Sequence, residues 1–214
     1  MRKLHFDYNT PGAYFITICT HHKKCTLSRI VGAIQESPAE TDSRNVVGAI
    51  HESPAETDLR NIVGAIHESP AENVALHVVG ATQDSPLQLT EYGKIITGVI
   101  SHIPDNYSAF VDSYVIMPNH IHLIIVITDT MDARAIRESP LRGRSVISKM
   151  VGYIKMNASK EIHKRFGDST IWQRGFHDHI IRNREDYEQI AKYIYENPIR
   201  WQYDCFYTAD DEMR

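Results

Sequence analysis

The alternation of apolar and polar positions along the chain predicts a small set of strands and helices. Three runs rich in aromatic and β-branched residues are typical of strands: residues 13–20, 109–117 and 120–127. Apolar residues recur at helical spacing in three other segments: residues 89–102, 145–166 and 185–196. Shorter apolar runs, which are further strand candidates, lie at residues 171–173 and 179–182.

The order of these elements is strand-helix-strand-strand-helix-strand, with one more helix behind it. This is the split βαβ order of ferredoxin-like folds. We therefore expect an α+β fold in which an antiparallel sheet packs on helices and leaves its other face free for a site. The last helix is additional to that pattern and carries Tyr193.

A sixteen-residue repeat interrupts this scaffold between the first strand and the first helix. Its opening Val-Gly-Ala begins at Val31, Val47, Val63 and Val79, and each unit continues to a Ser-Pro pair. Gly and Pro recur in every unit and break any regular structure into short pieces. We interpret residues 29–88 as a repetitive acidic insertion that is loop-like or disordered. A single domain then spans residues 1–202 around this insertion, and a C-terminal tail follows at residues 203–214.

The repeat also suggests an origin at the level of DNA. The unit Gly-Ala-Ile-His-Glu-Ser-Pro can be written in codons that contain a self-complementary stretch, and a degraded copy stands at residues 135–140. We hypothesise that palindromic DNA was duplicated into the gene in frame. The nucleotide sequence of the gene tests this, because codons that are not self-complementary would exclude it.

Charge is distributed unevenly along the chain, whose formal net charge is -4 at pH 7. Residues 29–88 carry three Lys and Arg against nine Asp and Glu, whereas residues 141–200 carry twelve against seven. The acidic insertion therefore masks a basic C-terminal region. That region either binds phosphate groups or is simply a solvated face, and charge alone leaves both interpretations open.

Apolar content and cysteine spacing restrict the class of protein. With 42% hydrophobic residues the chain has enough apolar material for a core, but its longest apolar run, residues 123–127, is too short to cross a bilayer. No apolar signal core follows Met1, and the three cysteines show no paired spacing. We therefore expect a cytoplasmic protein with reduced thiols and no membrane partner.

The most informative motif is His120-Ile121-His122, which opens the third predicted strand after Pro118. Because side chains alternate along a strand, His120 and His122 share one face while Ile121 lies on the other. Two neighbouring imidazoles on a rigid strand make a half-site for a divalent metal. The pair is equally compatible with ordinary histidines at a sheet edge.

The last predicted helix adds Tyr193 and Asn197, which are four residues apart and share one helix face. A metal held by His120, His122 and the Asn197 side-chain oxygen would keep positions open for a phosphate oxygen and water. Such a site suits Mg²⁺ or Mn²⁺ acting as a Lewis acid. Tyr193 would then attack phosphorus, and the alternative is an ordinary half-buried helix tyrosine.

These motifs together resemble the REP-associated tyrosine transposases, which belong to the single-tyrosine HUH superfamily. The segments that carry the resemblance are, in order, residues 117–122 (MPNHIH), 172–179 (WQRGFHDH) and 193–198 (YIYENP). Residues 11–17 are also similar to the family's first strand. The likeness covers residues 8–29 and 87–202, so the repetitive insertion lies outside it.

The resemblance implies a metal-dependent nuclease and strand transferase that acts on single-stranded DNA and on hairpin-forming palindromic repeats. In that family a tyrosine attacks a DNA phosphate, forms a 5′-phosphotyrosine link and frees a 3′-OH. Carried over to this chain, Tyr193 is the nucleophile and the metal ligands are His120, His122 and Asn197. Tyr195 is the rival nucleophile, but it lacks a ligand four residues on. The expected partner is single-stranded or hairpin DNA, bound by a monomer or homodimer.

Basic side chains around these motifs are candidates for contacts with DNA phosphates: Arg174, Arg182, Arg184, Lys192 and Arg200. Aromatic residues that could stack an unpaired base are Trp172, Phe176 and Tyr187, although core packing suits Trp172 better. Candidates for proton transfer to the leaving oxygen are His177 and His179.

Two other functions stay open at this point. One is an inactivated or domesticated protein that binds DNA hairpins without cutting them. The other is a metal-dependent hydrolase of small phosphoesters, in which Tyr193 has a structural role.

Overall fold

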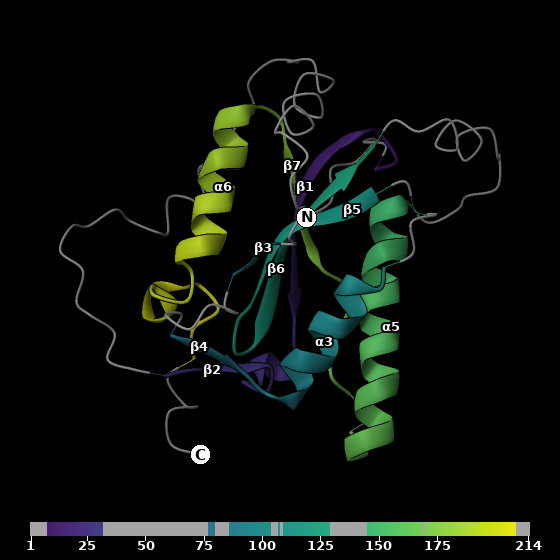
Figure 1. Ribbon diagram of the computed structural model, residues 1–214, viewed down its shortest axis with the longest axis vertical. Helices are drawn as coiled ribbons and strands as arrows, with labels where there is room; N and C mark the ends of the chain where they lie inside the picture. Colours follow the sequence, from purple (N-terminus) through teal and green to yellow (C-terminus); the bar gives the residue numbers. More distant parts are fainter. Residues whose placement is uncertain are drawn as a thin grey trace.

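The computed structural model describes residues 8–31, 77–79, 86–103, 107, 109–128, 145–168 and 170–208. Figure 1 shows a twisted sheet with two helices over one face and a third helix over the other. Within these ranges, no helix combines the length and the apolar content that crossing a membrane requires.

The sheet is built from strands far apart in the sequence. In spatial order they are β3 (His77–Val79), β5 (Ala109–Ile116), β6 (His120–Ile127), β1 (Gly12–Cys19) and β7 (His177–Ile181). Strand β6 pairs antiparallel with β5 and β1, and β1 pairs antiparallel with β7. Apart from β3, which joins β5 in parallel, this is the split βαβ arrangement, so the predicted ferredoxin-like fold is confirmed.

Three helices begin at side chains that cap them. They are α3 (Glu91–Ser101), α5 (Val146–Phe166) and α6 (Arg184–Glu196). The N-cap side chains of Thr90, Ser145 and Asn183 each accept a hydrogen bond from a backbone N–H three residues on. Helix α5 ends at Gly167, whose φ of 81° is the left-handed conformation that glycine adopts readily. These helices lie where the sequence predicts them.

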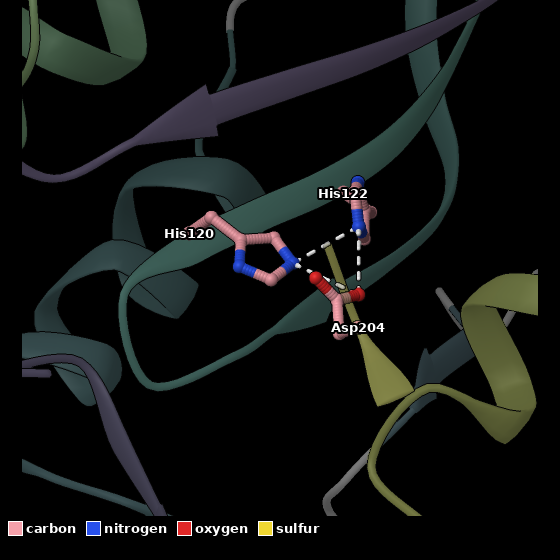
Figure 2. A group of neighbouring side chains, drawn as sticks. All are labelled: His120, His122 and Asp204. Carbon is pink, nitrogen blue, oxygen red and sulfur yellow. Dashed lines mark hydrogen bonds and ion pairs between the residues drawn. The ribbon is translucent and has the colours of Figure 1, made fainter. Parts of the chain in front are cut away.

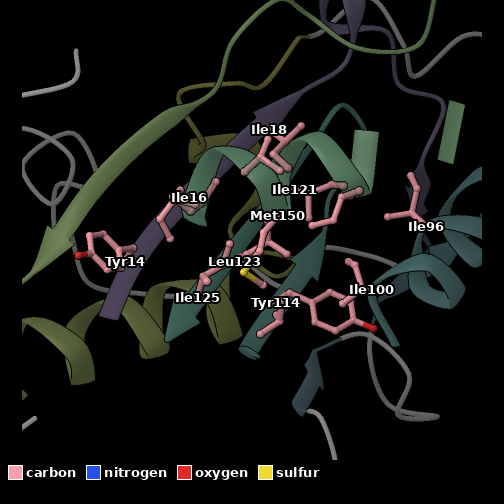
Figure 3. Packing of buried hydrophobic residues seen from close by; sticks show 14 of the residues in the cluster. Tyr14, Ile16, Ile18, Ile96, Ile100, Tyr114, Ile121, Leu123, Ile125 and Met150 are labelled. Atoms are coloured by element: carbon pink, nitrogen blue, oxygen red, sulfur yellow. The ribbon is translucent and has the colours of Figure 1, made fainter. Parts of the chain in front are cut away.

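One face of the sheet forms the main core with α3 and α5 (Figure 3). From β6, Ile121 and Leu123 pack in this layer with Ile100 of α3 and Met150 of α5. The other face packs against α6, where the apolar side chains of Ile124, Val126, Ile190 and Ile194 meet. As predicted, side chains of β6 alternate between two packed layers. One layer contains α3 and α5, and the other contains α6.

Two features differ from what the sequence predicts. Residues 171–173 do not form a strand of the sheet, and Trp172 makes only an isolated β-bridge to Thr20. The second sheet face is not open, because α6 and the short helix η3 (Trp201–Tyr203) cover it. The physical reason is that α6 has an apolar side of its own, which must be buried against the sheet.

The ends of the repetitive segment are strands rather than loop. Strand β2 (Ser28–Ile30) pairs antiparallel with β4 (Leu87–Leu89), and Val31 N donates to Pro86 O at 2.6 Å. The segment thus leaves and returns at neighbouring points, as an insertion must. Strand β3 also belongs to it and covers the edge of β5. Residues 32–76 and 80–85 lie outside the described residues, so the expectation of a loop-like insertion stays a prediction there.

We predict opposite effects of alanine at two glycines of α3. A Cβ on Gly93 would collide with the backbone oxygen of Leu27, whereas one on Gly98 meets nothing within 4 Å. Gly93→Ala should lower the free energy of unfolding by about 1–3 kcal/mol through overpacking. Gly98→Ala should raise it by about 0.5–1 kcal/mol through helix propensity. Chemical denaturation measures both, and a stabilised Gly93→Ala would contradict the close approach.

Candidate metal and tyrosine site

The two histidines of the motif lie on the α6 side of β6. Met117 N donates to His120 O at 2.9 Å, which closes the tight turn through Pro118 and Asn119 and starts the strand at His120. The alternation of β6 then sends His120 and His122 away from the Ile121 layer, as predicted. Both residues are buried: His120 is 0% exposed and His122 is 1% exposed.

The two imidazoles face each other through their Nε2 atoms, which are 2.9 Å apart. Their Nδ1 atoms have other partners: His120 Nδ1 lies 2.9 Å from Asn119 Oδ1, and His122 Nδ1 lies 2.9 Å from Thr17 Oγ1. Because an amide oxygen only accepts, His120 carries its proton on Nδ1 and presents a lone pair at Nε2. These outer hydrogen bonds orient both rings.

Asp204 completes the cluster, and the sequence analysis did not identify it. Its Oδ2 lies 3.9 Å from His120 Nε2 and 4.0 Å from His122 Nε2, and its side chain is 1% exposed. Figure 2 shows the carboxylate facing the Nε2 atoms of both rings. Asp204 follows η3, in the stretch that the sequence assigns to a C-terminal tail. Asp204 therefore belongs to the candidate site rather than to a separate tail.

Helix α6 delivers Tyr193 and Asn197 to the same cluster. Tyr193 Oη donates to Asp204 Oδ2 at 2.9 Å and lies 3.3 Å from His122 Nε2. Asn197 Nδ2 donates to the same Asp204 oxygen at 2.8 Å. Tyr195 points elsewhere, with 67% of the residue exposed. The structure thus brings Tyr193 and Asn197 together with both histidines and separates Tyr195 from them.

The charges of the site favour a neutral histidine, an ionised aspartate and a protonated tyrosine. Burial, together with the nearby His122, holds the pKa of His120 well below its usual value. Burial acts to raise the pKa of Asp204, but contact with His122 and the proximity of His120 outweigh it and lower this pKa. Burial, the Asp204 charge and the hydrogen bond to Asp204 raise the pKa of Tyr193 far above 10. In this arrangement Tyr193 needs a cation nearby to become a nucleophile.

The donor set fits a divalent cation. His120, His122 and Asp204 each offer one ligand atom, and these atoms lie within 4.8 Å of one another. Adjacent ligands of an octahedral cation, each about 2.0–2.1 Å from it, are about 2.9 Å apart, which matches the spacing of the two Nε2 atoms. Asn197 Oδ1 is buried and has no hydrogen-bond partner among the described residues. An oxygen left in that state suits the predicted role of Asn197 as a ligand.

The segment after η3 covers the cluster. The Phe206 ring centre lies 4.6 Å from that of His120, and Phe206 O accepts a hydrogen bond of 2.8 Å from Asn119 Nδ2. Cys25 Sγ and Thr208 Oγ1, 3.8 Å apart, link the end of this segment to the residues before β2. Phe206 and the residues after it therefore cover the histidines on this side of the cluster.

Most of the basic side chains predicted to hold DNA have acidic neighbours. Arg184 pairs with Glu188 at 2.7 Å, and Glu196 pairs with both Lys192 and Arg200, at 3.8 and 3.4 Å. Arg174 is exposed in the loop before β7. Arg182 is half-buried and donates its backbone N–H to Asp186. Of the five, Arg184 and Lys192 lie in α6, Arg182 lies just before it and Arg200 just after it.

The remaining candidates have structural partners. Trp172 packs against the core and donates from Nε1 to Lys155 O at 3.1 Å, as core packing requires. Tyr187 Oη donates to Asp112 Oδ2 at 2.5 Å and joins α6 to β5. His179 Nε2 lies 3.1 Å from Asp186 Oδ2. Phe176 is partly buried against the core, and His177 is exposed, with its ring centre 6.4 Å from that of Phe206.

Comparisons with known proteins place the chain among transposase relatives. No protein-family model matches it. An uncharacterized protein of Haemophilus influenzae is 25% identical over 97% of this chain and 92% of its own length. A putative REP-associated tyrosine transposase of the same organism is 28% identical over 54% of this chain, and a REP-associated tyrosine transposase of Escherichia coli is 29% identical over 42%. These alignments span 64% and 44% of the two named relatives.

A solved structure of a REP-associated tyrosine transposase bound to a REP hairpin is also similar. It is 16% identical in sequence, covers 95% of this chain and 76% of its own, and superposes with a TM-score of 0.44.

We predict that the cluster binds Mn²⁺ and that His120 is needed for it. His120→Ala should raise the Kd for Mn²⁺ by at least about tenfold, because it removes a ligand and its oriented hydrogen bond. The matched control is His163→Ala, since His163 is an exposed histidine of α5 outside the cluster. Titration calorimetry measures the three Kd values, and equal values would contradict the assignment.

Proposed function

We propose that this chain, a relative of the REP-associated tyrosine transposases, cuts and rejoins single-stranded DNA at hairpin-forming palindromic repeats through a 5′-phosphotyrosine intermediate. The observation that carries the proposal is the position of Tyr193. Its hydroxyl lies within hydrogen-bond distance of both Asp204 Oδ2 and His122 Nε2. A nucleophile, a proton acceptor and a set of metal ligands thus meet at one point.

Tyr193 Oη is the attacking atom in this proposal. A bond forms between Tyr193 Oη and phosphorus, and the bond from phosphorus to the 3′ oxygen of the preceding nucleotide breaks. The phenolic proton passes to Asp204 Oδ2, which already accepts its hydrogen bond at 2.9 Å. The 3′ oxygen leaves and takes a proton from water. The reverse reaction, with another 3′-OH as attacking group, joins strands and releases Tyr193.

The ligands proposed for the metal are His120, His122 and Asn197, with Asp204 beside them. A bound Mg²⁺ or Mn²⁺ would act there as a Lewis acid on the scissile phosphate and offset the negative charge that raises the pKa of Tyr193. The contribution of the chain is to hold these groups rigidly. The imidazoles are fixed by Thr17 and Asn119, and Asn197 is fixed by Asp204.

Hairpin or single-stranded DNA is the partner that we propose from the relatives and from the charge of the chain. Among the helices and strands of residues 141–200, the basic excess falls on α5, which carries five Lys and Arg against one Glu. Cations on this helix would contact the DNA backbone and make binding strongly dependent on salt.

The second candidate function is binding of DNA hairpins without cleavage. The closed state of the cluster favours it, because Tyr193 is half-buried among its partners and its pKa is raised. In that case the histidine cluster would stabilise the fold rather than catalyse. The covalent intermediate separates the two functions.

We predict that Tyr193→Phe abolishes a covalent adduct that the wild-type protein forms with DNA. The substrate is a labelled single strand that folds into a palindromic hairpin, incubated with Mn²⁺ and analysed after denaturation. Tyr195→Phe is the matched control, since Tyr195 lies on the same helix but is 67% exposed, and it should keep the wild-type rate.

The pattern of adducts decides among the alternatives. Hairpin binding without any adduct would support the non-cleaving function. Loss of the adduct in Tyr195→Phe and its persistence in Tyr193→Phe would transfer the nucleophile to Tyr195. If the protein neither binds the hairpin nor forms an adduct, the remaining alternative is a hydrolase of small phosphoesters.

A further inference from the structure

The turn after β1, formed by the short helix η1 (His21–Lys23), has an uncommon backbone. Both His22 and Lys23 have positive φ, 54° and 53°. Residues other than glycine enter this left-handed region at an energetic cost, and such residues collect at functional sites. The turn is nevertheless tied down, because Thr20 Oγ1 lies 2.9 Å from both Lys24 O and Asn119 O.

This backbone brings the Lys23 ammonium to the rim of the cluster. Lys23 Nζ lies 5.4 Å from the centre of the Phe206 ring, and that ring lies 4.6 Å from the ring of His120. Lys23 is half-buried, whereas its neighbour Lys24 is exposed. Lys23 is thus separated from the cluster by the Phe206 ring.

The charge of Lys23 is also available for a new partner. In the part of the chain that the structure describes, no carboxylate lies within ion-pair distance of Lys23. The basic side chains of α6 differ, since Arg184 and Lys192 both have glutamate partners one turn away. The Lys23 ammonium instead lies over the face of the Phe206 ring, which a bound phosphate would displace in the proposed function.

We propose that Lys23 is a catalytic cation that binds a non-bridging oxygen of the scissile phosphate during attack by Tyr193. This inference rests on the function proposed above. When a phosphate takes the place of the Phe206 ring beside His120, the ammonium exchanges a cation–π contact for a charge-assisted hydrogen bond. It then stabilises the negative charge on the phosphate in the transition state. The left-handed backbone of the turn is part of what holds this ammonium beside the Phe206 ring.

Replacing Lys23 should lower activity, because the ammonium is lost. Replacement by glycine should at the same time raise stability, because the strain of positive φ is relieved. Lys23→Ala should slow adduct formation with the Mn²⁺-loaded protein and saturating hairpin DNA by about 10²-fold, as loss of one transition-state donor does. Lys23→Gly should be equally slow yet melt about 2–4 °C higher, because glycine adopts positive φ freely. A side chain with a purely structural role would not combine a higher Tm with a lost rate.

Two neighbours serve as matched controls. His22→Gly relieves the same kind of strain without removing the ammonium, so it should raise the Tm and keep the wild-type rate. Lys24→Ala removes an exposed cation from the next position and should also keep the rate at saturating DNA. Lys23→Arg should recover part of the rate, since a guanidinium also binds phosphate.

The outcomes distinguish this inference from the function on which it rests. If the wild-type protein forms the adduct and both Lys23→Ala and Lys23→Gly form it at the wild-type rate, only the role of Lys23 is wrong. An equal loss of rate in His22→Gly would also overturn it, because the turn rather than the ammonium would then matter. If the wild-type protein forms no adduct, the proposed function and this inference fail together.

Discussion

The constraint on which the structure depends is the alternation of β6 between two packed layers. This strand lies in the interior of the sheet, with β5 on one side and β1 on the other. Its odd-numbered residues, such as Ile121 and Leu123, fill the core under α3 and α5. Its even-numbered residues face α6, and the first two of them are histidines. A shift of one residue in register would place both imidazoles in the apolar core.

Helix α6 depends on polar contacts to an unusual degree. Its fully buried side chains in the described structure are Ile190 and Ile194, which is little apolar area for a helix of this length. Near its N-terminal end Tyr187 is held by Asp112, and near its C-terminal end Tyr193 by Asp204. The helix that carries the proposed nucleophile is therefore positioned by hydrogen bonds at both ends. Hydrogen bonds of this kind fix the orientation of the helix more sharply than apolar packing does.

The charges around Tyr193 would have to change before this residue could act as the proposed nucleophile. With Asp204 ionised against it, Tyr193 is held as a neutral phenol, and the cluster is covered by the Phe206 segment. In the proposed function, a divalent cation and a phosphate would both have to enter this space. The arrangement described here is stable because the protein's own donors and acceptors satisfy one another. Those same groups would have to change partners when a substrate binds.

Local sequence patterns predicted much of the fold because they reflect short-range physics. The period of β6, the N-caps of the helices and the element order give the split βαβ sheet and place His120 and His122 on one face. The helical spacing of Tyr193 and Asn197 likewise follows from the chain itself. These are properties of neighbours within one element.

Contacts between distant elements depended on tertiary structure. Asp204 is one of four acidic residues in an apparent tail, with no periodicity or motif around it, and only the path of the chain after α6 brings it to the histidines. The repetitive segment gave no strand signal, yet β3 gains its partner from β5. Helix spacing favoured Tyr193 over Tyr195 because Asn197 follows four residues on, and tertiary structure adds that Tyr193 Oη meets Asp204 while Tyr195 is 67% exposed. The sequence by itself therefore determined the elements and identified four of the five side chains of the candidate cluster, whereas the convergence of separate elements added Asp204 and set the geometry.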